Sequence, residues 1–223
     1  MNLVKTFSVF SGLSSVNRYS MIHLGNPESV LEHIGMVAML SSFLAREVNC
    51  RDNYCVEIQT VMGKALVHDV DELIVGDVPR PTKYHNANIR EMFREVEAMG
   101  VRRVVAEMQL CPQLAGEVIR DHQFAKSGRE GLIVALADTL AVVYKVWEEV
   151  IVRNNMGMIR QATSVRNQLV SLHEKIVIEF EDARAEVVEF LTEIIEQAGE
   201  LMNRAAEKED PVHGAILEQM VAE

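Results

Sequence analysis

Hydrophobic positions recur at intervals of three and four residues along almost the whole chain, and no useful stretch alternates apolar with polar residues. The first spacing is typical of amphipathic helices, whereas alternation would indicate strands. The pattern therefore predicts an all-α protein. The predicted helices cover residues 3–14, 29–48, 55–75, 87–108, 112–123 and 129–153, and a long amphipathic helical stretch covers 164–206.

Glycine and proline set the expected ends of these helices. The helix over 55–75 is predicted to stop at Gly76, because glycine tolerates the left-handed conformation that closes many helices. Residues 76–84 contain Pro79 and Pro81 and are expected to form an ordered loop without helix.

The pattern also suggests how the chain is divided. We expect one helical domain over residues 1–160 and a C-terminal helical extension over 161–206. The apolar stripe of this extension must pack against the core or a dimer partner. Residues 207–223 are polar around a proline and a glycine, and we expect them to be a frayed tail.

Composition narrows the possible functions. With 223 residues, the chain suits one large domain or one domain plus an appendage. A formal charge of −11 argues against binding to a nucleic-acid polymer, which needs clustered Lys and Arg. No apolar run approaches the roughly 20 residues that span a bilayer. The three cysteines form no Cys-x-x-Cys pair, so we expect reduced thiols and a cytoplasmic location without membrane contact.

Candidate chemistry lies in three apolar helical runs, which contain His33, the adjacent pair His68-Asp69, and Asp138. One histidine in such a run is more often a satisfied core residue than a ligand. The joint occurrence favours a metal site, because buried carboxylates need a compensating charge. Imidazole and carboxylate suit Zn²⁺, Mn²⁺, Co²⁺ or Fe²⁺, and Mg²⁺ is also a candidate.

Helical spacing adds a candidate catalytic group. Glu72 follows His68 by four residues and Asp69 by three, so a continuous helix would place all three on one face. A carboxylate beside a metal can orient water or move its proton. Asp71 falls on another face and is expected to be solvated. His122 is expected to be an ordinary surface histidine, with a supporting role at the metal as the alternative.

Several motifs allow a comparison with a known family. They are Asn17-Arg18-Tyr19, Glu32-His33, His68-Asp69-x-x-Glu72, Gly76-Asp77-x-Pro79-x-Pro81-x-Lys83-Tyr84 and Ala137-Asp138. In order and spacing they resemble the bacterial 5′-deoxynucleotidases of the HD superfamily, over about residues 14–150. The resemblance implies an HD-domain helical bundle, usually a homodimer, that removes phosphate from deoxyribonucleoside 5′-monophosphates with a divalent cation.

The resemblance also implies roles for individual residues. Metal ligands would be His33, His68, Asp69 and Asp138. Glu72 and Asp77 would be catalytic, with Glu72 acting on the attacking water. Substrate would be bound by Arg18, which grips the phosphate, and by Tyr19, His33, Asp77, Val78, Pro79, Arg80 and Lys83.

Two departures from the family pattern keep other functions open. Tyr19 replaces a tryptophan associated with rejecting the ribose 2′-hydroxyl, and Arg80 replaces a small polar residue between the prolines. An extra cation could serve extra phosphates, so a deoxynucleoside triphosphate hydrolase that releases tripolyphosphate is the first alternative. A catalytically silent HD-like scaffold, with an acidic C-terminal stripe that binds a protein partner, is the second.

Overall fold

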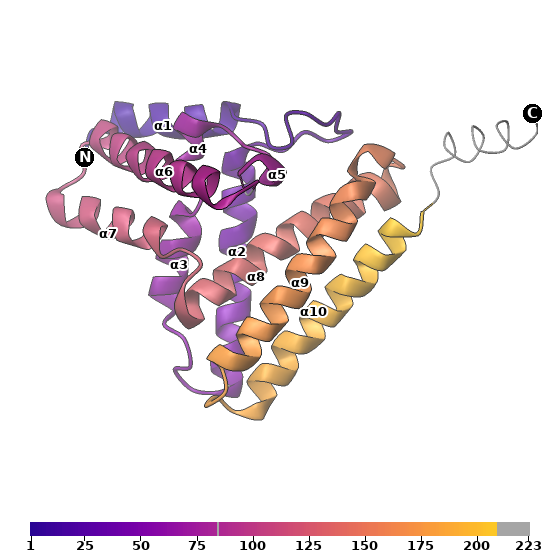
Figure 1. Cartoon of the computed structure of the whole chain (residues 1–223). Coiled ribbons are helices and arrows are strands. Elements are labelled where there is room, and N and C mark those ends of the chain that lie inside the picture. The colour runs from indigo at the N-terminus through magenta and orange to yellow at the C-terminus, as the bar shows by residue number, and fades with distance from the viewer. Residues whose placement is uncertain (84, 209–223) are drawn as a thin grey trace, which may run out of the picture.

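The computed structural model describes residues 1–83 and 85–208. Within these residues it contains helices and no strand, which confirms the all-α prediction (Figure 1). The α-helices are α1 (Leu3–Ser15), α2 (Val30–Arg51), α3 (Ile58–Val67), α4 (Glu72–Val75), α5 (Arg80–Lys83), α6 (Ala87–Met108), α7 (Pro112–Gln123), α8 (Gly128–Val146), α9 (Ile159–Glu179) and α10 (Ala185–Ala206). A π-helix, η1 (Trp147–Val152), and a 3₁₀ turn, η2 (Met156–Met158), join α8 to α9. No helix in the described part of the chain has the length and apolar character needed to cross a membrane.

The main core lies between α2, α3, α8, α9 and α10. Figure 1 shows α8, α9 and α10 side by side, and the buried side chains of Leu136, Leu169, Ile176 and Leu191 fill the space among them. The C-terminal helices therefore pack on α8 of their own chain. The predicted tail beyond residue 208 lies outside the described residues.

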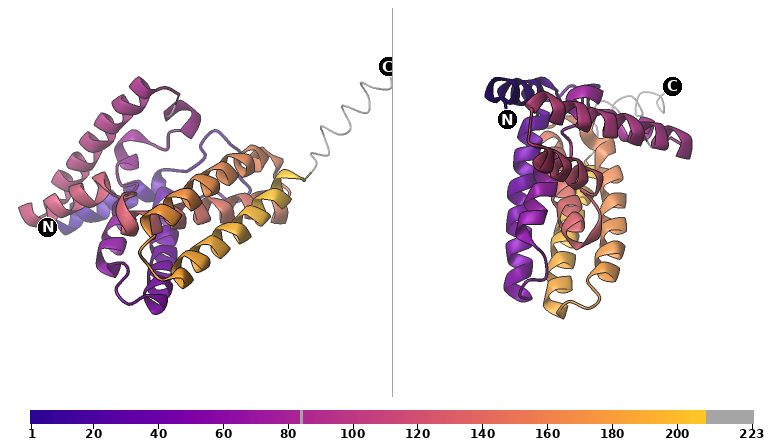
Figure 2. Two further views of the ribbon diagram at one scale, coloured as in Figure 1. Left: turned by 60° about the horizontal axis from the view of Figure 1, so that its bottom comes forward. Right: turned by 90° about the vertical axis from the view of Figure 1, so that its left-hand side faces the viewer.

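A smaller layer covers one end of this bundle. Figure 2 shows α1 and α6 lying across the end of the long helices. A second apolar cluster joins this layer to α2 through Val9, Leu13, Ile34 and Val104. The junction between the two layers contains the start of α2 and the segment that links α3 to α4.

The start of α2 is fixed by a capping box. The Ser29 hydroxyl accepts from the backbone N–H of Glu32, and the Glu32 carboxylate accepts from the backbone N–H of Ser29. These bonds satisfy backbone groups that the first helical turn leaves open. They place His33 on the first turn of α2, with its side chain fully buried.

The loop before α2 is anchored by a buried charged network. The carboxylate of Glu149, which is 0% exposed, accepts from the backbone N–H groups of Gly25 and Asn26 at 2.8 and 2.9 Å. Lys145 is 2% exposed and donates to the Asn26 carbonyl. Because each buried charge has a partner, this network holds the segment that leads to Glu28.

The predicted helix over 55–75 is wrong in its middle. Helix α3 ends at Val67, and α4 begins only at Glu72. Between them the backbone bonds shorten to three-residue spans, from Val70 N–H to the Val67 carbonyl and from Glu72 N–H to the Asp69 carbonyl. Apolar periodicity does not reveal this turn because α4 returns to a helical pattern. Gly76 closes α4 at φ +76°, as predicted.

Three other boundaries differ from the prediction. The expected loop over 76–84 contains the one-turn helix α5. The Pro79 carbonyl accepts from the backbone N–H groups of Thr82 and Lys83. A proline in the first turn of a helix is tolerated, because the N–H that it lacks would have no helical partner there. The helix expected over 129–153 changes from α-helix to π-helix after Val146. The amphipathic stretch over 164–206 is two helices, separated between Glu179 and Ala185. The helices predicted over 87–108 and 112–123 are confirmed.

Candidate active site

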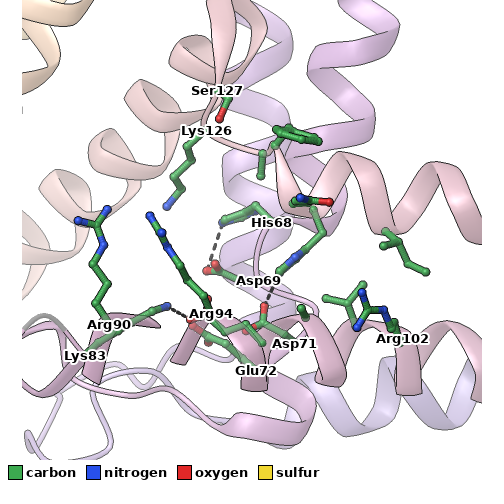
Figure 3. Close-up of a pocket in the computed structure, with 18 of the residues that line it drawn as sticks. His68, Asp69, Asp71, Glu72, Lys83, Arg90, Arg94, Arg102, Lys126 and Ser127 are labelled. Atoms are coloured by element: carbon green, nitrogen blue, oxygen red, sulfur yellow. Dashed lines mark hydrogen bonds and ion pairs between the residues drawn. The ribbon is translucent and has the colours of Figure 1, made fainter. Parts of the chain in front are cut away.

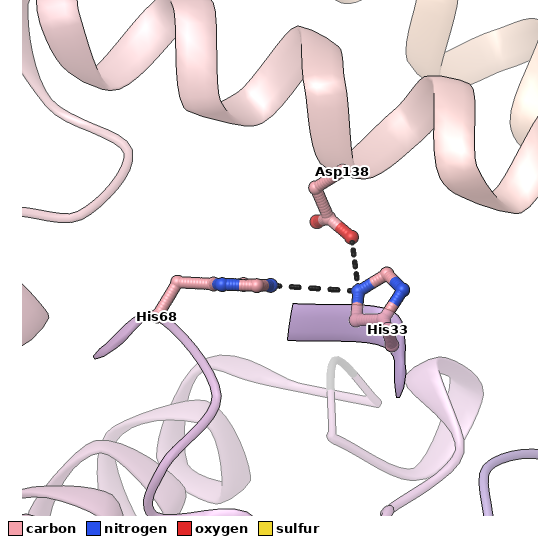
Figure 4. A group of neighbouring side chains, drawn as sticks. All are labelled: His33, His68 and Asp138. Atoms are coloured by element: carbon pink, nitrogen blue, oxygen red, sulfur yellow. Dashed lines mark hydrogen bonds and ion pairs between the residues drawn. The ribbon is translucent and has the colours of Figure 1, made fainter. Parts of the chain in front are cut away.

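Two buried histidines and two half-buried aspartates, from three parts of the chain, meet at one point. Nε2 of His33 on α2 lies 3.1 Å from Oδ1 of Asp138 on α8 and 3.4 Å from Nε2 of His68 (Figure 4). Oδ2 of Asp69 lies 3.2 Å from Nε2 of His68 and 3.6 Å from Nε2 of His33. All four predicted metal ligands are thus brought together. We call this group the His/Asp centre.

The histidine contacts outside the centre orient both rings. Nδ1 of His68 lies 2.7 Å from the Ala65 carbonyl and donates to it, so Nε2 is the ring nitrogen that faces the centre. Arg18 Nη1 donates to Nδ1 of His33, so the ring proton of the neutral His33 is on Nε2, toward Asp138. Binding of a cation to Nε2 of His33 requires that proton to leave and the Arg18 contact to open.

The charge states in the centre suit a divalent cation. Burial, together with the charge of Arg18, lowers the pKa of His33 to about 4, which keeps this imidazole neutral. Burial alone would raise the carboxyl pKa values, but His68 holds the pKa of Asp69 well below its usual range, and Lys126 does the same for Asp138. The ligand atoms of His33, His68 and Asp138 lie within 4.8 Å of one another. Two imidazoles and two carboxylates form a donor set for a divalent metal.

Glu72 lies beside the centre, with a carboxyl oxygen that is unpartnered among the described residues and a raised pKa. Its Oε2 atom is buried and has no hydrogen-bond partner within the described part of the chain. Burial, and to a smaller extent the negative charge of the neighbouring Asp69, raises the pKa of Glu72 to about 10. A cation in the centre would oppose both effects and favour the carboxylate. The role of Glu72 beside a metal stays a prediction.

The expectations for Asp71 and His122 are wrong. Asp71 is 5% exposed, and its Oδ1 accepts from Nε2 of His122 at 2.8 Å. His122 on α7 is therefore largely buried and paired, rather than an ordinary surface histidine. The turn at residues 68–71 explains the error, because it rotates Asp71 away from the position that a continuous helix would give it.

The predicted substrate residues Arg18, Tyr19 and Asp77 lie together on the α2 side of the centre. The Tyr19 backbone, at φ +55°, donates its N–H to the Asp77 carboxylate. The Arg18 guanidinium lies 5.2 Å from the centre of the Tyr19 ring and 3.3 Å from the Glu28 carboxylate. Within the described residues, the buried Tyr19 hydroxyl and Arg18 Nε have no hydrogen-bond partner.

The remaining predicted substrate residues are less close to this group. Val78 and Pro79 are half-buried to exposed residues of the segment before α5. Lys83 forms an ion pair with Glu97 on α6. The side chain of Arg80 lies outside the described residues, as does Tyr84.

A cavity of about 680 Å³ opens on the other side of the centre (Figure 3). His68, Asp69 and Glu72 line it, together with Arg90 and Arg94 of α6. Lys126, from the turn before α8, also lines the cavity and contacts the Asp138 carboxylate. Sequence reasoning missed these three cations. The spacing of Arg90 and Arg94, one helical turn apart, was the available signal.

An all-helical bundle with this His/Asp centre defines the class of HD-domain phosphohydrolases. The chain belongs to the YfbR-like 5′-deoxynucleotidase family, which it matches over residues 5–191. It is 30% identical over 153 residues to a 5′-deoxynucleotidase of Enterobacter sp. strain 638, across 67% of this chain and 74% of that one. The same identity and coverage hold for 5′-deoxynucleotidase YfbR of Shigella flexneri. The protein is therefore a nucleotide phosphohydrolase.

Solved structures agree on the fold. An HD-domain phosphohydrolase from Listeria innocua matches with a TM-score of 0.60 and 22% identity, over 89% of this chain and 98% of that chain. The cyanophage S-2L HD phosphohydrolase, solved with dA and one catalytic Zn²⁺ ion, matches with a TM-score of 0.59 and 16% identity, over 90% and 97% of the two chains.

Proposed function

We propose that this protein removes the phosphate from deoxyribonucleoside 5′-monophosphates, using a divalent cation held by His33, His68, Asp69 and Asp138. The convergence of these four side chains is the observation that supports it most directly. The names of the curated relatives support the substrate class. Two imidazole ligands favour Zn²⁺, Mn²⁺, Co²⁺ or Fe²⁺ over Mg²⁺, and the phage relative was solved with Zn²⁺.

The surrounding residues have complementary roles in this proposal. When bound, the cation supplies Lewis-acid polarisation of the phosphoryl group and lowers the pKa of water. Glu72 orients the attacking water and accepts its proton. Arg18 binds the phosphate, since a guanidinium matches two phosphate oxygens at once. Asp77 holds the backbone of Tyr19, so that its ring lies beside the nucleotide.

A substrate panel tests the proposal. Deoxynucleoside monophosphates, ribonucleoside monophosphates and deoxynucleoside triphosphates are incubated with Co²⁺, Mn²⁺, Zn²⁺ or Mg²⁺, and orthophosphate, pyrophosphate and tripolyphosphate are measured separately. We expect deoxynucleoside monophosphates to be hydrolysed with the highest kcat/KM of the panel, with orthophosphate as the product. Tripolyphosphate as the main product would contradict this and support the triphosphate hydrolase. Nucleotide binding without turnover would support the silent scaffold.

The role of Arg18 gives a separate prediction. Arg18→Ala removes a charged donor to the phosphate and should lower kcat/KM by about 100-fold. Arg18→Lys keeps the charge but loses the two-pronged geometry, so we expect an intermediate loss. Steady-state kinetics on a deoxynucleoside monophosphate measure both. Arg46→Ala, at an exposed position on α2, is the control, and an equal loss in that variant would refute a phosphate role for Arg18.

The remaining properties implied by the resemblance belong to the same proposal. A homodimer is supported by the apolar side chains that α1 exposes, namely Leu3, Val4, Phe7 and Phe10. A cytoplasmic location is supported by three free thiols, Cys50, Cys55 and Cys111.

A further inference from the structure

The loop between α1 and α2 carries Arg18 and is closed at its base by backbone bonds. Asn17 and Ser29 form an antiparallel bridge, and the backbone N–H of Arg18 donates to the Glu28 carbonyl at 2.9 Å. The Glu28 side chain, which is buried, accepts from Nη1 of Arg18 at 3.3 Å. The position of the Arg18 guanidinium therefore depends on where the loop holds Glu28.

The far side of this loop is bound by two adjacent glutamates of η1. Glu149 accepts from the backbone N–H groups of Gly25 and Asn26 at 2.8 and 2.9 Å, and from the side chain of Asn155 at 2.6 Å. Glu148 accepts from the side chain of Asn26 at 3.0 Å. Figures 1 and 2 show the loop next to the turn that joins α8 to α9.

The π-helix allows both glutamates to reach the loop. Adjacent side chains of an α-helix point about 100° apart, because one turn takes 3.6 residues. In η1 the turn is wider, since the backbone N–H of Arg153 donates to the Glu148 carbonyl five residues earlier. Single turns of π-helix are rare and are frequent at functional sites. Here the wider turn coincides with the two residues that hold the loop.

The carboxylate of Glu149 is charged although it is fully buried. Burial alone would raise its pKa, but hydrogen bonds from Asn155, Gly25 and Asn26 hold the pKa below its ordinary value. Lys145 lies 3.9 Å from this carboxylate and donates to the Asn26 carbonyl. Any shift of the loop would leave buried charges without partners, which is strongly unfavourable. The loop is therefore held in one position.

We propose that Glu149 is a positioning residue for the phosphate grip, and that it acts on Arg18 through the loop and Glu28. A displacement of about 1 Å at a group that binds the substrate can lower the rate by about 100-fold. The proposal rests on the proposed function in one respect, that Arg18 binds the substrate phosphate. If Glu149 served only the stability of the fold, its effect on the reaction would not depend on Arg18.

A double-mutant cycle between Glu149 and Arg18 tests this dependence. Glu149→Gln keeps the size of the side chain, but its amide nitrogen cannot accept from the N–H groups of the loop. We expect kcat/KM to fall by at least about tenfold in the otherwise unmodified protein. In an Arg18→Ala background the same substitution should lower it by less than about twofold, because no grip is left to misplace. Glu28→Gln changes the link between the two residues and should give the same pattern.

Thermal unfolding and metal content are measured for every variant, so that each loss refers to folded protein with bound metal. Ile176→Val is the control, because it removes a methylene group from the same core in the last turn of α9, whereas the loop adjoins η2 at the other end of that helix. It should leave kcat/KM unchanged in both backgrounds. If Glu149→Gln does not fold, Glu28→Gln carries the test.

The outcomes separate this inference from the proposed function. The cycle uses the nucleotide that the substrate panel shows to be hydrolysed fastest, or calorimetric binding of a deoxynucleoside monophosphate if none is hydrolysed. Equal losses from Glu149→Gln in both backgrounds, or no loss in either, would overturn the positioning role alone. An Arg18→Ala protein with full activity and affinity would overturn the phosphate role of Arg18, and this inference with it.

Discussion

Replacement of His68 by alanine is expected to abolish phosphate release and metal binding together. His68 points its Nε2 atom at both His33 and Asp69, and its ring is held in place by the Ala65 carbonyl. Without it, the remaining donors are one imidazole and two carboxylates with no fixed fourth ligand. Because Lewis-acid polarisation contributes several kcal/mol, kcat/KM should fall by roughly 10³-fold or more.

Two measurements on each variant check this expectation. Metal content per chain is determined by elemental analysis after dialysis, and orthophosphate release is followed with a deoxynucleoside monophosphate. Asp69→Asn should also lose both, since it removes a negative charge while preserving volume. His173→Ala, a half-buried histidine on α9, should keep both. Full activity in a protein shown to contain no metal would refute the assignment of the centre.

The meeting of the four side chains was predictable, because the sequence shows polar residues at positions where their burial is unfavourable. A histidine and a carboxylate inside an apolar helix need compensation, and three such places in one chain compensate each other only if they meet. The structure places His33, His68, Asp69 and Asp138 around one point. Their role as metal ligands stays a prediction, as does the division of the chain at residue 160.

Local pattern could not reveal the turn between α3 and α4. Residues on both sides of it keep a helical period, so the sequence predicts one continuous helix over 55–75. The turn brings together residues far apart in the sequence, such as Asp71 and His122, which are 51 residues apart and hydrogen-bonded. The cavity has the same origin, because Arg90 and Lys126 reach it from elements whose packing no local pattern encodes.

Glu72→Gln is expected to change activity and stability in opposite directions. Glutamine keeps the shape of the side chain but cannot accept the proton of the attacking water, so kcat should fall by about 10² to 10⁴-fold. In the metal-free protein, the same substitution removes an acid whose ionisation is strongly disfavoured by burial and by Asp69. The variant should therefore be more stable than the unmodified protein at neutral pH, by about 1–3 kcal/mol.

The sign of the pH effect follows from proton uptake on folding. The pKa of Glu72 is about 10 in the folded, metal-free protein and about 4.5 ordinarily, so the folded state holds the proton more tightly between these values. Stability of the unmodified protein should fall as pH rises through that window, and Glu72→Gln should remove this part of the pH dependence.

Urea unfolding with chelator at pH 5, 7 and 9 measures the free energy of unfolding, with Glu95→Gln at an exposed position on α6 as control. Added divalent metal should reduce the difference in stability between Glu72→Gln and the unmodified protein, because a cation in the centre stabilises the Glu72 carboxylate. A destabilised Glu72→Gln protein without metal would contradict the buried, protonated state of Glu72.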